Sequence, residues 1–561
     1  TAESNAYTMK SRYLTVLAFT IFSTLMTTQV NAATIAPVRA QNAMVVSASA
    51  HASQAGIDIM KQGGNAFDAA AATGFALAVT HPSAGNLGGG GFLVAHTTDG
   101  RSLTLDYRES APAAAHKDMF LDASGEVIPG LSLRSPLASG TPGSVDGLLK
   151  IWRDHGSGTI SRRQLIAPAV ALAKNGFSIS RNLANALNAG RDRFQNDPCA
   201  SKIFVRGDGK PWKAGDRLIQ KDLSKSLKRI ARHGRDGFYT GAIAELLAAQ
   251  QEKSGGIITL NDLRDYESVY RDPVTGTYKE YEIISMGPPS SGGILLIHML
   301  NMLEAYDLKS YGWNSAQAIH LLTEVQRRAY ADRSLHLGDS DFHDVPLAWL
   351  ASKTYAHARA ASIDTTRATP STEINAGAPM PIESEETCHY SVYDQHGNSV
   401  AVTTTLNGGF GSGIVIHGAG FLMNNEMDDF SSKPGTPNLY GLIGSEANAI
   451  APNKRMLSSM TPTIILKNDK PNLILGSPGG STIITTVLQN FLNVTQHGMN
   501  IQEAIAAPRY HSQWLPDVVS HEPRAFTNDT RQKLLALGHT LTERRSIGQA
   551  NAIHITPDAI L

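Results

Sequence analysis

Residues 386–407, ETCHYSVYDQHGNSVAVTTTLN, alternate between apolar and polar side chains on both sides of a polar turn, which predicts a β-hairpin. The first strand begins at Thr387, directly behind the acidic run ESEE at 383–386. The preceding residues, 360–386, are rich in Thr, Pro, Ala, Ser and Glu, which predicts an exposed linker open to proteolysis. Either a loop ends there and a strand starts, or the chain is cut and Thr387 becomes a new N-terminus.

The composition limits the kind of protein that this chain can be. It has 561 residues, with Lys+Arg and Asp+Glu both at 49, so its net charge does not indicate a nucleic-acid partner. Only 7% of the residues are aromatic, whereas 50 residues are glycine. Glycines and small aliphatic residues favour a layered α/β protein with tight turns, and they exclude a coiled coil or a disordered chain.

The N-terminal region has the three parts of a secretory signal peptide, predicted over residues 9–32. A basic start at 9–12 precedes an apolar stretch at 13–27, and small residues then place the cleavage site before Ala33. The apolar stretch is short for a membrane span, so we expect a periplasmic or secreted protein without a stable span; a retained N-terminal anchor is the alternative. Residues 1–8 are set aside as an added or misassigned start.

The sequence lacks the motifs of a disulfide framework, a metal site and two common classes of enzyme. The two cysteines, Cys199 and Cys388, are too few and too far apart in the sequence to define a disulfide framework. There is no Cys/His cluster at ligand spacing and no H-E-x-x-H, so no metal site and no cofactor are predicted. The missing G-x-S-x-G elbow and Walker A loop argue against a lipase-like hydrolase and an NTPase.

Periodicity and turn residues predict a chain in which helices and strands are mixed. A nearly apolar helix over 66–79 is expected to be buried between layers, and residues 145–265 are predicted to be mostly helical. The four glycines at 88–91 precede a strand and form either a ligand contact or a tight turn. The other predictions are helices at 294–306, 315–332, 482–497 and 500–507, and strands at 104–108, 274–286, 388–394, 398–406, 420–424, 461–466 and 472–475.

A chain cut before Thr387 would carry a nucleophile and a base on one residue. A free α-amine has a pKa of about 7.7–8.0, so near pH 7 it can accept the proton of the threonine hydroxyl. Such a site needs neither His nor Asp, in agreement with the missing serine-hydrolase motifs. Most threonines are structural, but Thr387 ends a linker and starts a strand whose neighbour, AVTTTLN, is rich in threonine.

Three further segments could supply parts of an amidase site. NNEMDDFSS (424–432) holds three carboxylates behind an apolar stretch, although such a run is more often a solvated surface. SSMTPT (458–463) offers two adjacent hydroxyls before a strand. GSPGGST (476–482) is a glycine turn before a helix, whose N-terminal amides could stabilise an oxyanion. These residues by themselves do not identify the substrate.

Eight motifs in one order along the chain resemble those of the γ-glutamyltranspeptidases, which belong to the N-terminal nucleophile hydrolase superfamily. The motifs are GGNAFDAAAATGFALAVTHPSAGNLGGGGF, LDYRESAP, GPPSSGG, TCHYSVYD, TTTLN, NNEMDDFS, PNKRMLSSMTPT and GSPGGS. The resemblance covers essentially everything after the signal peptide. It implies a four-layer αββα sandwich, an α/β (α+β) fold in which two face-to-face sheets lie between helical layers.

The resemblance also implies that an inactive precursor cuts itself between Glu386 and Thr387. The large subunit would be 33–386 and the small catalytic subunit 387–561. Both would remain together as a heterodimer in one αββα unit.

The positions that match the family's site have different roles. Thr387 matches the nucleophile of both self-cleavage and turnover, and Thr405 matches the threonine that orients it. The other matches are the oxyanion pair Gly479 and Gly480; Arg108, Ser458 and Ser459 for the substrate α-carboxylate; Asn407, Glu426 and Asp429 for its α-ammonium; and Tyr440 in a lid loop over 434–448. A guanidinium suits a carboxylate and carboxylates suit an ammonium, so this set fits a zwitterionic γ-glutamyl head group.

The activity that the resemblance implies is γ-glutamyl transfer from glutathione and other γ-glutamyl compounds through a Thr387 ester. Water as the acceptor gives hydrolysis, and amino acids or dipeptides as acceptors give transpeptidation. Two alternatives stay open: an acylase of the same fold that acts on glutaryl-cephalosporins, and a binding homologue without catalysis. The sequence departs from the family's pattern at Cys388, where Thr is common, and at Glu426, where some bacterial members have Gln.

Overall fold

The computed structural model describes residues 35–375 and 387–561. The predicted signal peptide and the linker residues directly before Thr387 lie outside these ranges. Within them, no helix is long and apolar enough to cross a membrane.

The predicted hairpin is present as β9 (Cys388–Tyr393) and β10 (Ser399–Thr405). Asp394 fixes its turn, because the carboxylate accepts hydrogen bonds from the backbone N–H groups of His396 and Asn398 at 2.9 and 3.0 Å. The two strands pair antiparallel, and β10 pairs with a further strand on its other side. The hairpin is therefore the interior of a sheet.

Two antiparallel sheets form the centre of the molecule. The first has six strands in the order β1 (Met44–Ser47), β9, β10, β2 (Gly90–His96), β3 (Ser102–Tyr107) and β6 (Val269–Arg271). The second has five strands in the order β16 (Ile553–His554), β12 (Lys470–Leu475), β11 (Thr463–Lys467), β8 (Tyr281–Ser285) and β7 (Val274–Tyr278).

Alternating side chains along the strands explain why the sheets pack face to face. Phe92 and Val94 of β2 lie in the apolar core between the sheets together with Ile464 of β11, whereas Leu93 lies in the core on the other face of its sheet. Ile465 of β11 likewise lies in the core on the outer face of the second sheet. Both faces of each sheet are therefore buried, and each outer face needs a covering layer.

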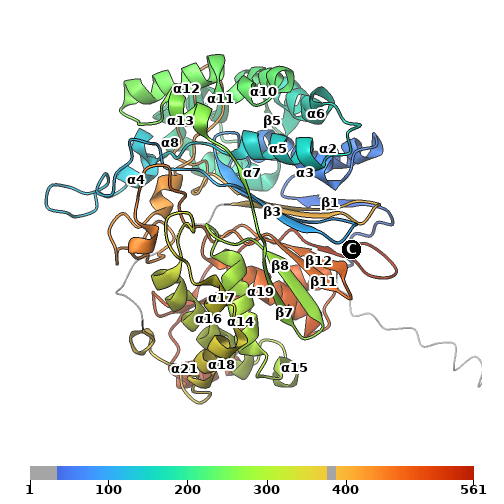
Figure 1. Ribbon diagram of the computed structural model, residues 1–561, viewed down its shortest axis with the longest axis vertical. Coiled ribbons are helices and arrows are strands. Elements are labelled where there is room, and N and C mark those ends of the chain that lie inside the picture. Colours follow the sequence, from blue (N-terminus) through green and yellow to red (C-terminus); the bar gives the residue numbers. More distant parts are fainter. Residues whose placement is uncertain (1–34, 376–386) are drawn as a thin grey trace, which may run out of the picture. The chain divides into compact units, whose positions relative to one another are not determined.

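Helices supply those covering layers, so the order is helix, sheet, sheet, helix (Figure 1). The first layer contains α2 (Ala50–Lys61), α3 (Ala66–Thr80) and α5 (Ser144–His155), and the second contains α14 (Gly292–Leu303), α16 (Ala316–His336) and α19 (Thr482–Thr495). All 15 residues of α3 are buried, as expected for a helix that is apolar all round. The predicted αββα sandwich is confirmed.

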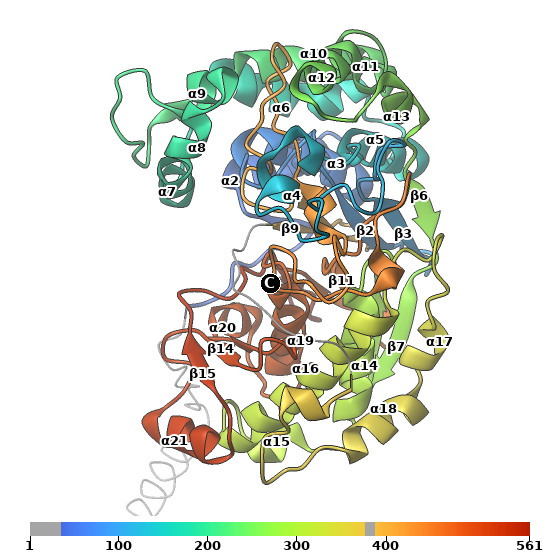
Figure 2. The ribbon, with the colours of Figure 1, turned by 90° about the vertical axis from the view of Figure 1, so that its left-hand side faces the viewer.

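Residues 145–265 are mostly helical, as predicted; α5 belongs to the first helical layer, and α6, α10, α11 and α12 lie beyond that layer on the side away from the sheets (Figure 2). Their elements are α6 (Arg162–Asn175), β4 (Phe177–Ser178), α7 (Arg181–Ala189), α8 (Arg191–Gln195), α9 (Pro198–Phe204), β5 (Arg217–Leu218), α10 (Lys221–His233), α11 (Asp236–Tyr239), α12 (Gly241–Ser254) and α13 (Leu260–Asp265). The smaller elements elsewhere are α4 (Leu131–Arg134), α15 (Leu308–Tyr311), α17 (Leu347–Leu350), α18 (Lys353–Ala361), α20 (Ile501–Ala506), α21 (Asn528–Ala536), β13 (Tyr510–His511), β14 (Val519–His521) and β15 (Leu541–Glu543).

The strand predicted at 420–424 is wrong. This segment makes only isolated bridges, to Val415 and Gly88. Gly418 and Gly420 have φ angles of 78° and 76°, so the chain turns back on itself at the start of the segment. Apolar composition alone could not show these turns.

The prediction of an exposed linker is wrong at Ser371, which is buried. Its Oγ donates a hydrogen bond to the carbonyl of Trp514 at 2.5 Å, and its own carbonyl accepts one from the Trp514 indole at 2.9 Å. The predicted linker is therefore anchored to the C-terminal part of the chain before residues 376–386, which lie outside the described residues.

Candidate active site

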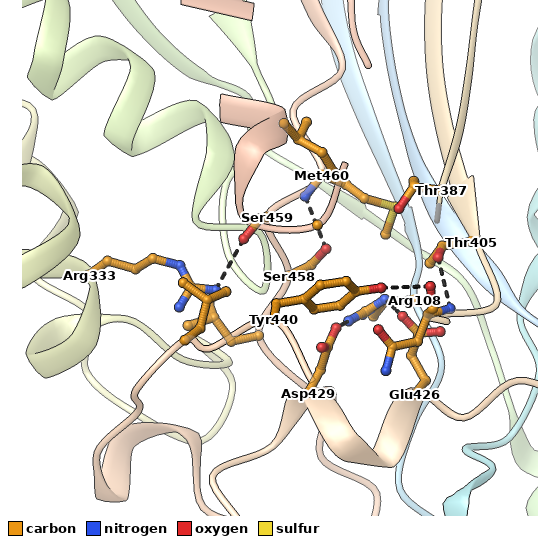
Figure 3. Close-up of a pocket in the computed structure, with 15 residues that line it drawn as sticks. Arg108, Arg333, Thr387, Thr405, Glu426, Asp429, Tyr440, Ser458, Ser459 and Met460 are labelled. Atoms are coloured by element: carbon orange, nitrogen blue, oxygen red, sulfur yellow. Dashed lines mark hydrogen bonds and ion pairs between the residues drawn. The ribbon is translucent and has the colours of Figure 1, made fainter. Parts of the chain in front are cut away.

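One pocket, at the end of the sheet where β9 begins and β10 ends, brings together nearly all of the residues selected from the sequence (Figure 3). Ten of the eleven line it, namely Arg108, Thr387, Thr405, Asn407, Glu426, Asp429, Tyr440, Ser458, Ser459 and Gly480. Gly479 is adjacent in the sequence but does not line the cavity. The cavity volume is about 20 Å³, little more than one water molecule requires, so a substrate must displace part of its wall.

Thr387 lies directly before β9 and is buried. The register of β9 with β10 pairs Cys388 with Thr404, so its continuation by one residue places Thr387 opposite Thr405. The Thr405 hydroxyl accepts a hydrogen bond from the backbone N–H of Asn407 at 2.8 Å. Because that bond uses a lone pair, the hydroxyl proton of Thr405 can still be donated to another oxygen.

The glycine turn before α19 has a backbone that other residues adopt with difficulty. Gly479 and Gly480 have φ angles of 138° and 53°. A Cβ on Gly480 would lie 2.3 Å from the Tyr440 ring. The Gly479 carbonyl accepts hydrogen bonds from the N–H and the hydroxyl of Thr482, at 2.9 and 2.8 Å, which hold the turn against the first residue of the helix. Backbone amides at a helix start are a suitable oxyanion site.

Arg108, which follows β3, is fully buried and forms ion pairs with Glu426 and Asp429. Glu109 Oε2 lies 3.7 Å from Arg108 Nη1. Burial raises the pKa of Glu109 to about 7 and also raises the pKa values of Glu426 and Asp429, while Arg108 opposes each shift. Three carboxylates around one guanidinium leave an excess of negative charge, so the cluster favours a proton or a further cation.

Two acceptor atoms of this pocket are buried without a hydrogen-bond partner among residues 35–375 and 387–561: Asn407 Oδ1 and Glu426 Oε2. The Asn407 amide nitrogen is already used, because it donates to the Asn425 carbonyl at 2.9 Å. A buried acceptor without a donor is costly, so both atoms suit a ligand that brings N–H groups.

The serine pair is positioned by the GPPSSGG turn at 287–293. The backbone N–H of Ser458 donates to the Pro289 carbonyl at 2.8 Å, and the Ser458 carbonyl accepts from the N–H of Ser291 at 2.8 Å. The Ser459 hydroxyl accepts a hydrogen bond from Arg333 at 3.3 Å. The backbone of Ser458 and the side chain of Ser459 are therefore both held in place.

Tyr440 lines the pocket from the loop at 434–448. Its hydroxyl donates to the Asn407 carbonyl at 2.6 Å, so the side chain lies across the cavity beside Arg108 (Figure 3). The same loop is tied to the acidic segment, because Asn438 Nδ2 donates to Asp429 at 3.1 Å. Tyr440 therefore lies at the pocket, and its role as a lid residue stays a prediction.

Sequence reasoning missed two charged residues of the site. Glu109 directly follows Arg108 in LDYRESAP, so its place in that motif was an available signal. Arg333 lines the pocket from α16 and is 4% exposed. Its helix mixes charged and apolar residues on all sides, so periodicity could not show that this side chain is buried.

Comparisons with known proteins identify the family of this chain. The family model described as "Gamma-glutamyltranspeptidase" matches residues 52–561. A glutathione hydrolase proenzyme of Escherichia coli (strain K12) is 49% identical over 526 residues, which are 94% of this chain and 90% of the relative. The chain belongs to the γ-glutamyltranspeptidase family. The family and enzyme class predicted from the sequence are thereby confirmed.

Two solved structures with the same fold differ in what their names describe. The chain in the crystal structure of Helicobacter pylori γ-glutamyltranspeptidase has 44% sequence identity to this chain, with a TM-score of 0.59. The match covers 61% of this chain and 97% of that chain. The cephalosporin acylase from Bacillus halodurans is 26% identical, with a TM-score of 0.81 and 96% coverage of each chain. The γ-glutamyltranspeptidase fold is thus shared with an acylase, and the site residues must separate the two activities.

Proposed function

We propose that this γ-glutamyltranspeptidase cuts itself between Glu386 and Thr387, and that Thr387 then transfers γ-glutamyl groups from glutathione and other γ-glutamyl compounds. The acceptor is water in hydrolysis and an amino acid or dipeptide in transpeptidation. The observation that supports this most strongly is that Thr387 shares one pocket with opposite charges suited to a zwitterionic head group.

The head group fits the charges of the pocket. Its α-carboxylate would bind Arg108 and the two serines, while its α-ammonium would bind Glu426 and Asp429. In the structure these positive and negative groups pair with one another, so the zwitterion would replace that pairing on both sides. The ammonium would also supply donors to Asn407 Oδ1 and Glu426 Oε2.

In self-cleavage, Thr387 Oγ would attack the carbonyl carbon of Glu386. The C–N bond breaks, the proton moves to the leaving nitrogen, and an ester between Glu386 and Thr387 forms. The leaving nitrogen thereby becomes the free α-amine of Thr387. Water then hydrolyses the ester and releases the Glu386 carboxylate and the Thr387 hydroxyl. The products are the large subunit, 33–386 after signal removal, and the small subunit, 387–561.

In turnover, the free α-amine of Thr387 would take the hydroxyl proton as Oγ attacks the γ-carbonyl carbon of the substrate. The amides of the glycine turn at 479–480 would stabilise the oxyanion, and Thr405 would orient the nucleophile. The amide C–N bond breaks, the proton passes to the leaving amine, and a γ-glutamyl ester remains on Thr387. Water or an acceptor amine then attacks this ester and regenerates the enzyme.

Substrate entry would require the lid to open. Tyr440 lies over the cavity, which has only about 20 Å³ of free volume. Breaking the hydrogen bond from Tyr440 to the Asn407 carbonyl would release the ring while the sheets stay in place. Closure over bound substrate would exclude water and favour transfer to amine acceptors.

A substrate pair separates this function from that of the acylase. A glutaryl group keeps the terminal carboxylate of a γ-glutamyl group but lacks the α-ammonium, so it leaves Glu426 and Asp429 without a partner. We expect γ-glutamyl-p-nitroanilide to be turned over with a kcat/KM at least about 100-fold above that of glutaryl-p-nitroanilide, because buried charges would be left unpaired. Preference for the glutaryl compound would assign the protein to the acylases, and absence of turnover of both would favour the binding homologue.

Export to the periplasm or the exterior is part of the same proposal and rests on the signal-peptide pattern of residues 9–32. Cell fractionation of a strain that expresses the full chain tests it. Activity confined to the cytoplasmic fraction would contradict it.

A further inference from the structure

The pocket contains two buried arginines in different electrostatic surroundings. Arg108 has three carboxylates within 4.0 Å. Arg333, on α16, is also buried, yet among the described residues no carboxylate lies within 4.0 Å of its guanidinium nitrogens. In Figure 3 the two arginines lie on either side of Tyr440.

Arg333 donates hydrogen bonds to two serines, Ser291 and Ser459. Its Nε donates to Ser291 Oγ at 2.9 Å, and Ser291 Oγ in turn donates to the Ser458 carbonyl at 2.7 Å. Its Nη2 donates to Ser459 Oγ at 3.3 Å. One guanidinium thus holds the backbone of Ser458 through Ser291 and the side chain of Ser459 directly.

The hydrogen bond to Ser459 determines what that hydroxyl can do. A guanidinium has only donors, so Ser459 Oγ must act as the acceptor in this contact. The hydroxyl proton of Ser459 is then available to an acceptor in the cavity. An anion is the acceptor that this arrangement favours, because the donated proton and the nearby guanidinium both attract it.

The charge of Arg333 favours the same ligand. Burial lowers its pKa to about 10, so it remains a cation at neutral pH. Asp429 opposes this shift, but it is paired with Arg108, and Arg333 has no carboxylate of its own within 4.0 Å among the described residues. A buried charge without a close partner is unfavourable, and a bound carboxylate would reduce that cost.

We propose that Arg333 is a positioning residue for the α-carboxylate of the donor substrate, acting through Ser459 and through its own charge. This inference rests on the proposed function, because it takes the bound anion to be the α-carboxylate of a γ-glutamyl group. Arg333 does not touch the reacting carbonyl, so it affects donor binding and leaves the chemical step largely unchanged.

The test compares Arg333→Gln with the wild-type protein on γ-glutamyl-p-nitroanilide. We expect KM to rise about tenfold or more and kcat to stay within about threefold, since the lost interactions bind the unreacted part of the substrate. Arg333→Lys keeps the charge but loses the fork of donors, so its KM should lie between the two. The Ki of the product L-glutamate should rise in parallel with KM.

A matched control and a double variant test whether the effect of Arg333→Gln comes from positioning the substrate or from a general disturbance of the fold. Arg359→Gln removes a partly buried arginine of the same helical layer, which pairs with Asp332 outside the pocket, and should leave KM unchanged. In a Ser459→Ala background, Arg333→Gln should raise KM by clearly less than it does in the wild type, because part of its effect passes through Ser459. The proposal would be overturned if the rise in KM of the double variant equalled the product of the two single-variant rises. A fall in kcat with no change in KM would also overturn it.

If Arg333→Gln does not mature, Ser291→Ala provides the second route. It removes the acceptor of Arg333 Nε and should raise KM about threefold at unchanged kcat, as expected for the loss of one hydrogen bond to a charged group. An unchanged KM would overturn the proposal. Turnover of the donor by the wild-type protein tests the proposed function separately; a wild-type protein that cannot turn it over would overturn both.

Discussion

The nucleophile side and the head-group side of the pocket consist of different kinds of residue. Thr387, Thr405 and the glycine turn on the nucleophile side are uncharged, and they depend on strand register and backbone angles. The head-group side depends on buried charges from distant segments, such as Arg108 and Glu426, which are 318 residues apart in the sequence. The difference suggests that bond making and substrate recognition are separable: changes on the first side should alter kcat and self-cleavage, and changes on the second should alter KM.

The largest effect is expected for Thr387→Ala. Without the hydroxyl there is no nucleophile for either reaction, so the chain should stay uncut and kcat should fall by roughly 10⁴-fold or more. Denaturing gel electrophoresis and the γ-glutamyl-p-nitroanilide assay measure the two outcomes. Thr387→Ser, which keeps a hydroxyl, should still be cut. Normal cutting of the alanine variant would show that another group performs the cleavage.

The next effect is expected for Gly480→Ala. The new Cβ would lie 2.3 Å from the Tyr440 ring and would require a φ of 53° at an alanine, so the oxyanion amides should be displaced and kcat should fall by about 10²–10³-fold. Gly498→Ala is the matched control, because Gly498 has a φ of 68° but no atom within 4 Å of an added Cβ. The control should keep its kcat. Equal losses in both variants would point to backbone strain alone.

A smaller effect, on the other side of the pocket, is expected for Arg108→Ala. Its loss removes charged hydrogen bonds to the α-carboxylate, so KM should rise by about 10- to 100-fold. Self-cleavage should continue, because the Glu386–Thr387 bond carries no γ-glutamyl head group. Steady-state kinetics on the matured variant provide the measurement. If the variant fails to cut itself, the head-group side is also needed for self-cleavage, and the two sides of the pocket are not separable in function.

The smallest effect is a pH dependence of KM. Burial raises the pKa of Glu109 to about 7, so the carboxylate cluster holds a proton below that pH and loses it above. A proton in the cluster competes with the substrate α-ammonium, so KM should fall as pH rises from 6 to 8, by roughly three- to tenfold. Glu109→Gln should flatten this profile. An equal slope in wild type and variant would place the titration elsewhere.

The nucleophile side could largely be predicted from the sequence because its determinants are local. The strand pattern from Cys388 to Thr405 sets the register that places Thr387 opposite Thr405, and the run GSPGGST predicts the turn before a helix. The same local reasoning was wrong at 420–424, where two turning glycines prevented a strand.

The head-group side could not be derived from local pattern. The acidic run at 424–432 has the composition of a solvated surface. Local pattern made it one possible part of an amidase site, and only the family resemblance gave Glu426 and Asp429 the role of binding an α-ammonium. Their burial against Arg108 depends on packing between distant segments. Arg333 was missed for the same reason, since its burial follows from how α16 packs against α14 and α21.

The central claim is that Thr387 is a new N-terminus made by self-cleavage, and intact mass spectrometry of the purified protein tests it most directly. The account predicts two chains in equal amounts, the smaller with the mass of residues 387–561 and Thr387 at its N-terminus. It also predicts that γ-glutamyl-p-nitroanilide activity appears together with these chains. A single uncut chain with full activity would contradict the account.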